Sequence, residues 1–183
     1  RWQRIADAWE ERALTGLRPF NDVHAMLAFV ATQRWASARR LLDTLRDCAR
    51  KAPDLRRAVH DAALPVCEAF IAFGRQRYAA AARQLQAQQR LARGCGGSRA
   101  QCDLLHLTWL EAALRSHQPA MAQRLLGERV ASRPQSPFNA RLRERVAQAL
   151  SRPLSRARYT TATQPRSADA RRIPAPTRLP AMP

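Results

Sequence analysis

The sequence predicts an all-α protein, and three features lead to that prediction. Up to residue 150, apolar residues recur at spacings of three and four, as on one face of a helix. The same region has few clusters of β-branched residues and no alternating strand pattern. Glycines and prolines divide the helical patterns into short segments, which favours helices that reverse direction in pairs.

The first helices are predicted from their apolar stripes and their start signals. Trp2, Ile5, Ala6 and Trp9 share one face of the opening helix. The next helix spans 22–32, with Asn21 as its N-cap and Asp22 at the positive end of the helix dipole. A third helix is expected over 35–50.

The remaining helices are bounded by proline and glycine. The segment 54–74 contains Pro65, which lacks a backbone donor, so it predicts two helices or one kinked helix. Further helices are expected over 76–93, 98–116, 119–131 and 137–150. Gly74, Gly94 and Gly127 are the predicted terminators.

A repeat emerges when "RWASARRLL", "RYAAAARQL" and "QPAMAQRLL" are aligned. Ala38, Ala81 and Ala122 then coincide, 43 and 41 positions apart, and a leucine follows each after four residues. The pattern resembles the second helix of the tetratricopeptide repeat, where a small residue lets two helices approach closely. We therefore expect a right-handed superhelix of degenerate tetratricopeptide-like helix pairs, an α-solenoid. An irregular helical bundle with coincidental alanines is the alternative.

The charge is strongly basic, at +18, with 31 arginines and a single lysine, Lys51. Residues 1–150 carry 25 basic and 13 acidic groups, and 151–183 carry 7 basic and one acidic group. GC-rich codon usage produces such an arginine excess without selection for binding. Acidic residues are interleaved with the arginines through residue 150, so we do not expect a nucleic-acid partner.

Residues 151–183 differ in composition from the rest of the chain. Six prolines, several arginines and small polar residues show no periodicity there. Such a segment cannot bury enough apolar area to offset an ordering cost of about 1–2 kcal/mol per residue. We expect a helical domain over 1–150 and a disordered Pro/Arg-rich tail over 151–183.

No apolar run approaches the roughly 18 residues that a membrane span requires, and the first residues lack a secretory signal pattern. We expect a cytoplasmic protein without a membrane partner. The four cysteines, Cys48, Cys67, Cys95 and Cys102, form no C-x-x-C pair. We therefore expect reduced thiols, no metal and no cofactor.

The stretch "RGCGGSRAQCDLLHL", residues 93–107, is the most site-like in the chain. It follows a helix and has no lysine, so it does not match a nucleotide-binding loop. Ser98 and Gln101 fit a capping box, Gly96 and Gly97 allow a chain reversal, and Asp103 places negative charge near the helix start. An anion-binding role assisted by Arg93 and Arg99 is the alternative.

Catalytic motifs are not evident. His24 follows "RPFND", and a histidine beside a carboxylate can act as a general base, but it is more often a capping or buried hydrogen-bonding group. The other histidines lack H-E-x-x-H spacing, and no G-x-S-x-G elbow occurs. We therefore expect no enzymatic activity and no catalytic residue.

Four motifs in order resemble the C-terminal half of the tetratricopeptide repeat protein 38 family: "RWQRIADAWEER", "FNDVHAMLAF", "LPVCEAFIAFGRQRYAAAARQL" and "GGSRAQCDLL". The resemblance covers about residues 1–135. Gln76 and Arg77 stand where the family has Gly-Asp, and Cys102 replaces an arginine. The resemblance implies helical repeats with no established activity, and further repeats upstream of Arg1.

The function expected from all this is a noncatalytic scaffold that presents a concave surface to a protein or peptide partner. The alternative is a small-ligand or enzymatic pocket in which the family motifs converge. Its candidate residues are Asn21, Asp22, His24, Gly96, Gly97, Ser98, Gln101 and Asp103.

Overall fold

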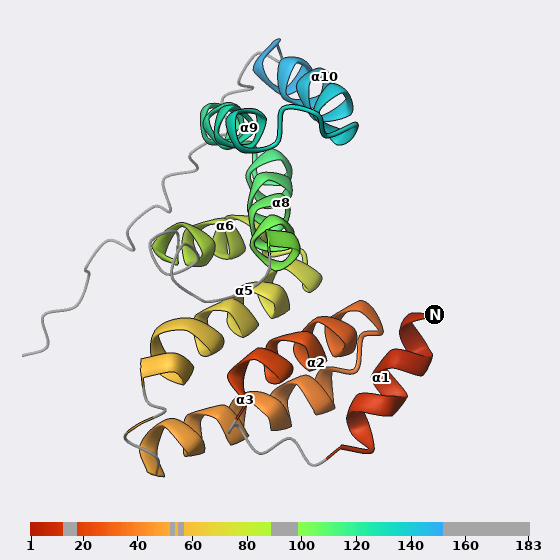
Figure 1. The fold of residues 1–183 in the computed structure, drawn as a ribbon, viewed down its shortest axis with the longest axis vertical. Coiled ribbons are helices and arrows are strands. Elements are labelled where there is room, and N and C mark those ends of the chain that lie inside the picture. Colours follow the sequence, from red (N-terminus) through yellow and green to blue (C-terminus); the bar gives the residue numbers. More distant parts are fainter. Residues whose placement is uncertain (13–17, 52–53, 55–56, 89–98, 152–183) are drawn as a thin grey trace, which may run out of the picture. The chain divides into compact units, whose positions relative to one another are not determined.

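The computed structural model describes residues 1–12, 18–51, 54, 57–88 and 99–151, and all regular structure in them is helical. The first elements are α1 (Trp2–Glu10), α2 (Pro19–Ala31), α3 (Trp35–Lys51) and the π-helix η1 (Arg57–Ala63). They are followed by α5 (Leu64–Gly74), α6 (Tyr78–Ala87), α8 (Arg99–Arg115), α9 (Pro119–Ser132) and α10 (Phe138–Ser151) (Figure 1). The predicted all-α class is confirmed. The predicted tail beyond Ser151 lies outside the described residues.

Two of the predicted helix ends are wrong. Helix α2 begins at Pro19, with Arg18 as N-cap, so Asn21 lies inside the first turn and is not the cap. Proline is favoured at the first helical position because the missing N–H has no intrahelical partner there. Gly127 is not a terminator, because α9 continues through it to Ser132. Gly74 does end α5, and Gly94 lies outside the described residues.

The segment around Pro65 forms two helical elements in direct succession. The π-helix η1 ends at Ala63 and α5 begins at Leu64, so Pro65 falls in the first turn of α5. Proline cannot donate to the carbonyl four residues earlier, and the wider turn of η1 directly precedes it. The two elements are contiguous, and Ala63 between them has helical φ and ψ, so the chain stays helical through the change from a π-turn to an α-turn before Pro65.

Three helix reversals share one backbone geometry. Gln33, Gln76 and His117 have φ of 58°, 59° and 56°, and they are 43 and 41 positions apart. After each, the next amide donates five residues back: Arg34 to Phe29 at 2.8 Å, Arg77 to Ala72 at 2.8 Å and Gln118 to Ala113 at 2.9 Å. A left-handed residue with this hydrogen bond defines the Schellman motif. The pairs α2/α3, α5/α6 and α8/α9 are therefore joined in the same way.

The aligned alanines lie where the sequence pattern placed them. Ala38, Ala81 and Ala122 are at most 1% exposed, in the first turns of α3, α6 and α9. The leucines four residues later, Leu42, Leu85 and Leu126, are also buried. A methyl side chain there allows the helices of a pair to approach closely.

Helix α5 connects two hydrophobic clusters. Val66, Cys67 and Phe70 pack in a cluster with residues of α2 and α3, whereas Ala69 and Ala72 pack with α6, α8 and α9. Figure 1 shows α5 between the α2/α3 pair and α6. Its sequence, LPVCEAFIAFG, is apolar nearly all round, as expected for a helix covered on both sides.

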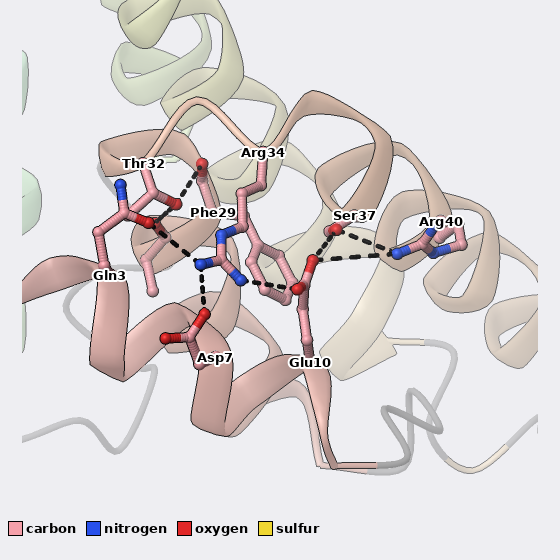
Figure 2. A network of polar contacts seen from close by, with 9 residues as sticks. Gln3, Asp7, Glu10, Phe29, Thr32, Arg34, Ser37 and Arg40 are labelled. Atoms are coloured by element: carbon pink, nitrogen blue, oxygen red, sulfur yellow. Dashed lines mark hydrogen bonds and ion pairs between the residues drawn. The ribbon is translucent and has the colours of Figure 1, made fainter.

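A polar network fastens α1 to the reversal between α2 and α3. The guanidinium of Arg34 donates to Glu10 at 2.6 Å, to Gln3 at 3.1 Å and to Asp7 (Figure 2). Ser37 donates to Glu10, and Arg40 donates to Ser37 at 3.0 Å. The hydrogen bonds from Ser37 and Arg34 lower the pKa of Glu10. This cluster is satisfied internally and is best explained as structural.

Candidate functional site

The α2 part of the predicted site contains a buried carboxyl group. Asp22 is 2% exposed, and its Oδ2 has no hydrogen-bond partner among the described residues. Burial raises the pKa of Asp22 to about 6, because the charged form loses its hydration. Sequence analysis placed Asp22 in the first turn, which is confirmed, but it did not predict that the side chain would be buried.

The thiol of Cys67 on α5 is close enough to Asp22 to sense its charge. Cys67 is fully buried, and that burial raises the pKa of its thiol, with smaller contributions from Asp22 and Glu68. A thiol that resists ionisation is a poor nucleophile. The pair therefore provides no activated cysteine.

His24 is held by its own helix. Its Nδ1 lies 2.7 Å from the carbonyl oxygen of Phe20, and the two rings have centroids 4.5 Å apart. Asp22 and His24 are two residues apart on α2, and residues at this spacing point in different directions from a helix. The carboxylate and the imidazole therefore do not share one face, as a general base and its orienting group would need to do.

The α8 part of the predicted site is only partly described. Gly96, Gly97 and Ser98 lie outside the described residues, and so does the side chain of Gln101. The proposed capping box therefore remains a prediction. Asp103 is in the second turn of α8, where its carboxylate pairs with Arg129 and, at 3.3 Å from the Nε, with Arg133.

Arg129 is an unusual residue of α9 because its charged side chain is buried. It is 2% exposed, bonds Asp103 through Nη1 and donates from Nη2 to the Ser136 hydroxyl at 3.2 Å. Its Nε has no partner among the described residues. Nearby, the amide of Asn139 donates to the Arg133 carbonyl at 2.8 Å, which fixes the start of α10 against the end of α9.

These residues line a cavity of about 410 Å³. Its wall is formed by Asp103, Arg129 and residues 133–138, the last of which is Phe138, exposed to 59%. Sequence analysis missed this cavity. The only signal was the "RPQSPF" segment, whose two prolines and aromatic residue follow a helix.

The two parts of the predicted site, on α2 and on α8, interact with different helices. The charge of Asp22 acts on Cys67 of α5, whereas Asp103 is paired with Arg129 of α9. Helix α2 packs mainly against α1, α3, η1 and α5, while α8 packs mainly against α6 and α9. Among the predicted site residues whose side chains the structure describes, Asp103 is the one that lines the cavity.

Two searches of the described residues, one for groups of metal-ligating side chains and one for membrane-spanning helices, gave no candidate. No three of the described histidine, cysteine, aspartate and glutamate side chains come together in a group that could hold a metal ion. Within the same residues, no helix combines the length and apolar character needed to cross a bilayer.

Comparison with known proteins adds nothing to the class that the structure defines, an all-helical protein. No protein-family model matches the chain, and no solved structure matches it. The resemblance to the tetratricopeptide repeat protein 38 family therefore rests on the sequence motifs alone.

Proposed function

We propose that residues 1–150 form a degenerate α-solenoid of tetratricopeptide-like pairs that binds a protein or peptide partner without catalysing a reaction. The observation that carries the proposal is the recurrence of one Schellman reversal at Gln33, Gln76 and His117. Each reversal precedes a buried alanine and, four residues on, a buried leucine. Stacked helix pairs of this kind offer extended surfaces that are suited to binding.

Contacts between successive pairs support the repeat interpretation. The guanidinium of Arg75, after α5, lies 5.0 Å from the ring centroid of Trp35, which begins α3. One pair further on, Arg115 of α8 lies 5.2 Å from the ring of Tyr78, which begins α6, and bonds its hydroxyl at 2.9 Å. An arginine at the end of the first helix of one pair thus covers the turn aromatic of the preceding pair.

We also propose kinship with the tetratricopeptide repeat protein 38 family. Gln76 has φ of 59°, a conformation that glycine adopts most readily, and the family has glycine at this position. The family's aspartate in F-N-D-x-H-A-M corresponds to Asp22, which is buried here and whose charge raises the pKa of the buried Cys67 thiol. Both positions therefore have a role in the fold, one in the chain reversal and one in the buried interior, that would account for the family motif.

The alternative of a small-ligand or enzymatic pocket is a second candidate, favoured by the unpartnered, buried Oδ2 of Asp22. It predicts that Asp22→Asn abolishes a measurable ligand-dependent increase in melting temperature. The scaffold proposal predicts instead that Asp22→Asn leaves the capture of a protein partner unchanged.

Partner capture tests the scaffold proposal. The 183-residue chain and a version truncated after residue 150 are compared as baits, with nuclease treatment and at two salt concentrations. Capture by both baits that survives the higher salt supports a folded binding surface. Capture that is lost on tail deletion, with a steep dependence on log salt, would instead indicate polyanion binding and overturn the proposal.

A further inference from the structure

Helix α1 carries an apolar stripe that the described part of the chain leaves exposed. Trp2 is 48% exposed and Ile5 is 43% exposed, and Trp9, one turn further along the same face, is only partly buried. Of the six large apolar side chains that are exposed in the described residues, Trp2 and Ile5 are the two that lie one turn apart on one helix. Exposed apolar side chains that adjoin one another are typical of an interaction surface, whereas single ones are ordinary.

The flank of α1 next to this stripe has one free charge of each sign. Arg4, Ala8 and Glu11 follow one another at spacings of four and three, so they share a face. Glu11 directly follows α1 and keeps helical φ and ψ. All three are exposed, and neither Arg4 nor Glu11 forms an ion pair within the described part of the chain. The two other carboxylates of α1 are both held by Arg34.

The order of these groups along α1 makes the face complementary to itself in one orientation. Because the basic residue is near the start of the helix and the acidic one just after its end, an antiparallel second copy places Arg4 against Glu11 and Glu11 against Arg4. A two-fold axis perpendicular to both helices relates such copies and brings matching flanks together, so Ile5 of one copy meets Trp9 of the other. Ala8 lies at the centre of this register, where its short side chain allows the helices to approach closely. A parallel copy would instead set like charges against each other.

We propose that α1 is the contact face of a symmetric dimer, in which it packs antiparallel against α1 of a second copy of this chain. The proposal goes beyond the scaffold function, because it assigns α1 to self-association and not to the capture of a different protein. One face of a nine-residue helix is smaller than a standard interface, so the expected dissociation constant is on the order of 10 µM.

Sedimentation equilibrium of the full 183-residue chain at about 0.15 M salt measures this association. Arg4→Glu and Glu11→Arg each replace two ion pairs by two contacts between like charges, so each should raise the dissociation constant by about tenfold. Ile5→Ser tests the apolar flank and should weaken the dimer as well. Because the three side chains are exposed, the variants should keep the fold, which circular dichroism melting curves check.

Mixing the two charge variants provides the sharpest comparison. An α1 that is acidic at both positions then faces an α1 that is basic at both, so an equimolar mixture of Arg4→Glu and Glu11→Arg should recover the wild-type affinity as a heterodimer. Arg143→Glu is the matched control, because it changes the net charge as Arg4→Glu does but lies at an exposed position of α10. It should leave the dissociation constant unchanged or lower it, since a smaller net positive charge reduces repulsion between the copies.

Three outcomes overturn the proposal. The first is a chain that stays monomeric at about 100 µM, which would leave α1 to a different occupant. The second is association that Arg4→Glu, Glu11→Arg or Ile5→Ser does not weaken. The third is a mixture of the two charge variants that associates no better than either variant alone. Partner capture by the full chain is measured separately, so the scaffold function can stand when the dimer fails.

Discussion

Gly74 lies against the indole of Trp35, so closely that a Cβ on Gly74 would stand 3.1 Å from Cη2 of the ring and would overlap Cγ1 of Val30. The end of α5 therefore meets the α2/α3 reversal with no room for a side chain. The α2/α3 and α5/α6 pairs can approach this closely only because residue 74 is glycine.

Gly74→Ala is predicted to destabilise the protein. The added methyl must displace Val30 or Trp35, and overpacking of this kind costs about 1–3 kcal/mol. Urea denaturation followed by circular dichroism measures the change. An unchanged free energy of unfolding would mean that α5 can move away from Trp35 freely.

Gly127→Ala is predicted to have the opposite effect and provides the control. Gly127 is exposed inside α9, and nothing lies within 4 Å of the position of an added Cβ. Alanine is favoured over glycine in a helix interior by about 0.5–1 kcal/mol, so the variant should unfold at a higher urea concentration. A destabilised variant would argue against an α-helical conformation at residue 127.

Gln76→Gly is predicted to stabilise the reversal between α5 and α6. Gln76 has φ of 59°, which carries a steric penalty for a residue with a Cβ. Relief of that penalty is worth about 0.5–1 kcal/mol after the greater freedom of glycine in the unfolded chain is counted. The same substitution at Gln86, an exposed α6 position, should instead lower the melting temperature.

The helix pairs could be predicted because their signals are local. The spacing of Ala38, Ala81 and Ala122 relative to their leucines depends only on the period of a helix. The errors arose where the preference of one residue is outweighed by another residue. Asn21 is a good cap in isolation, but Pro19 already begins the helix. Gly127 does not end α9: the helix continues to Ser132, and Arg129, two residues further on, pairs with Asp103 of α8.

The ionisation of Asp22 is predicted to lower stability as the pH rises. Its pKa is about 6 in the folded protein, above the ordinary value, so folding favours the protonated form. Its contribution to stability is fully present below pH ~4 and is lost as the pH rises through ~6, by about 3 kcal/mol in all, of which about 2 kcal/mol falls between pH 4 and pH 7. Asp22→Asn removes this dependence.

The measurement is the free energy of unfolding of both proteins at pH 4 and pH 7. Subtracting the variant from the wild type cancels the opposite trends of Glu10 and Glu111, whose pKa values are lowered. From pH 4 to pH 7, the free energy of unfolding of the variant should rise by about 2 kcal/mol relative to that of the wild type. A constant difference would show that Asp22 is hydrated or paired in solution.

The cavity was beyond prediction from sequence, because its parts become neighbours only through tertiary packing. Asp103 and Arg129 are 26 residues apart and lie on two helices. By sequence, Asp103 was explained as a favourable charge near a helix start, and Arg129 was one arginine among 31. The periodicity of the sequence does not distinguish a buried arginine from an exposed one. Arg129 is recognised as buried only once its ion pair with Asp103, between α9 and α8, is seen.

Removal of the Asp103 charge should destabilise the protein more than removal of the whole ion pair. Asp103→Asn leaves the buried Arg129 guanidinium without its counter-charge, at a cost of about 3 kcal/mol. The double variant Asp103→Asn, Arg129→Met has no charge to compensate and should recover most of that loss. Denaturation of the wild type, both single variants and the double variant gives the coupling energy of the pair. Additive effects would mean that the two side chains do not interact in solution.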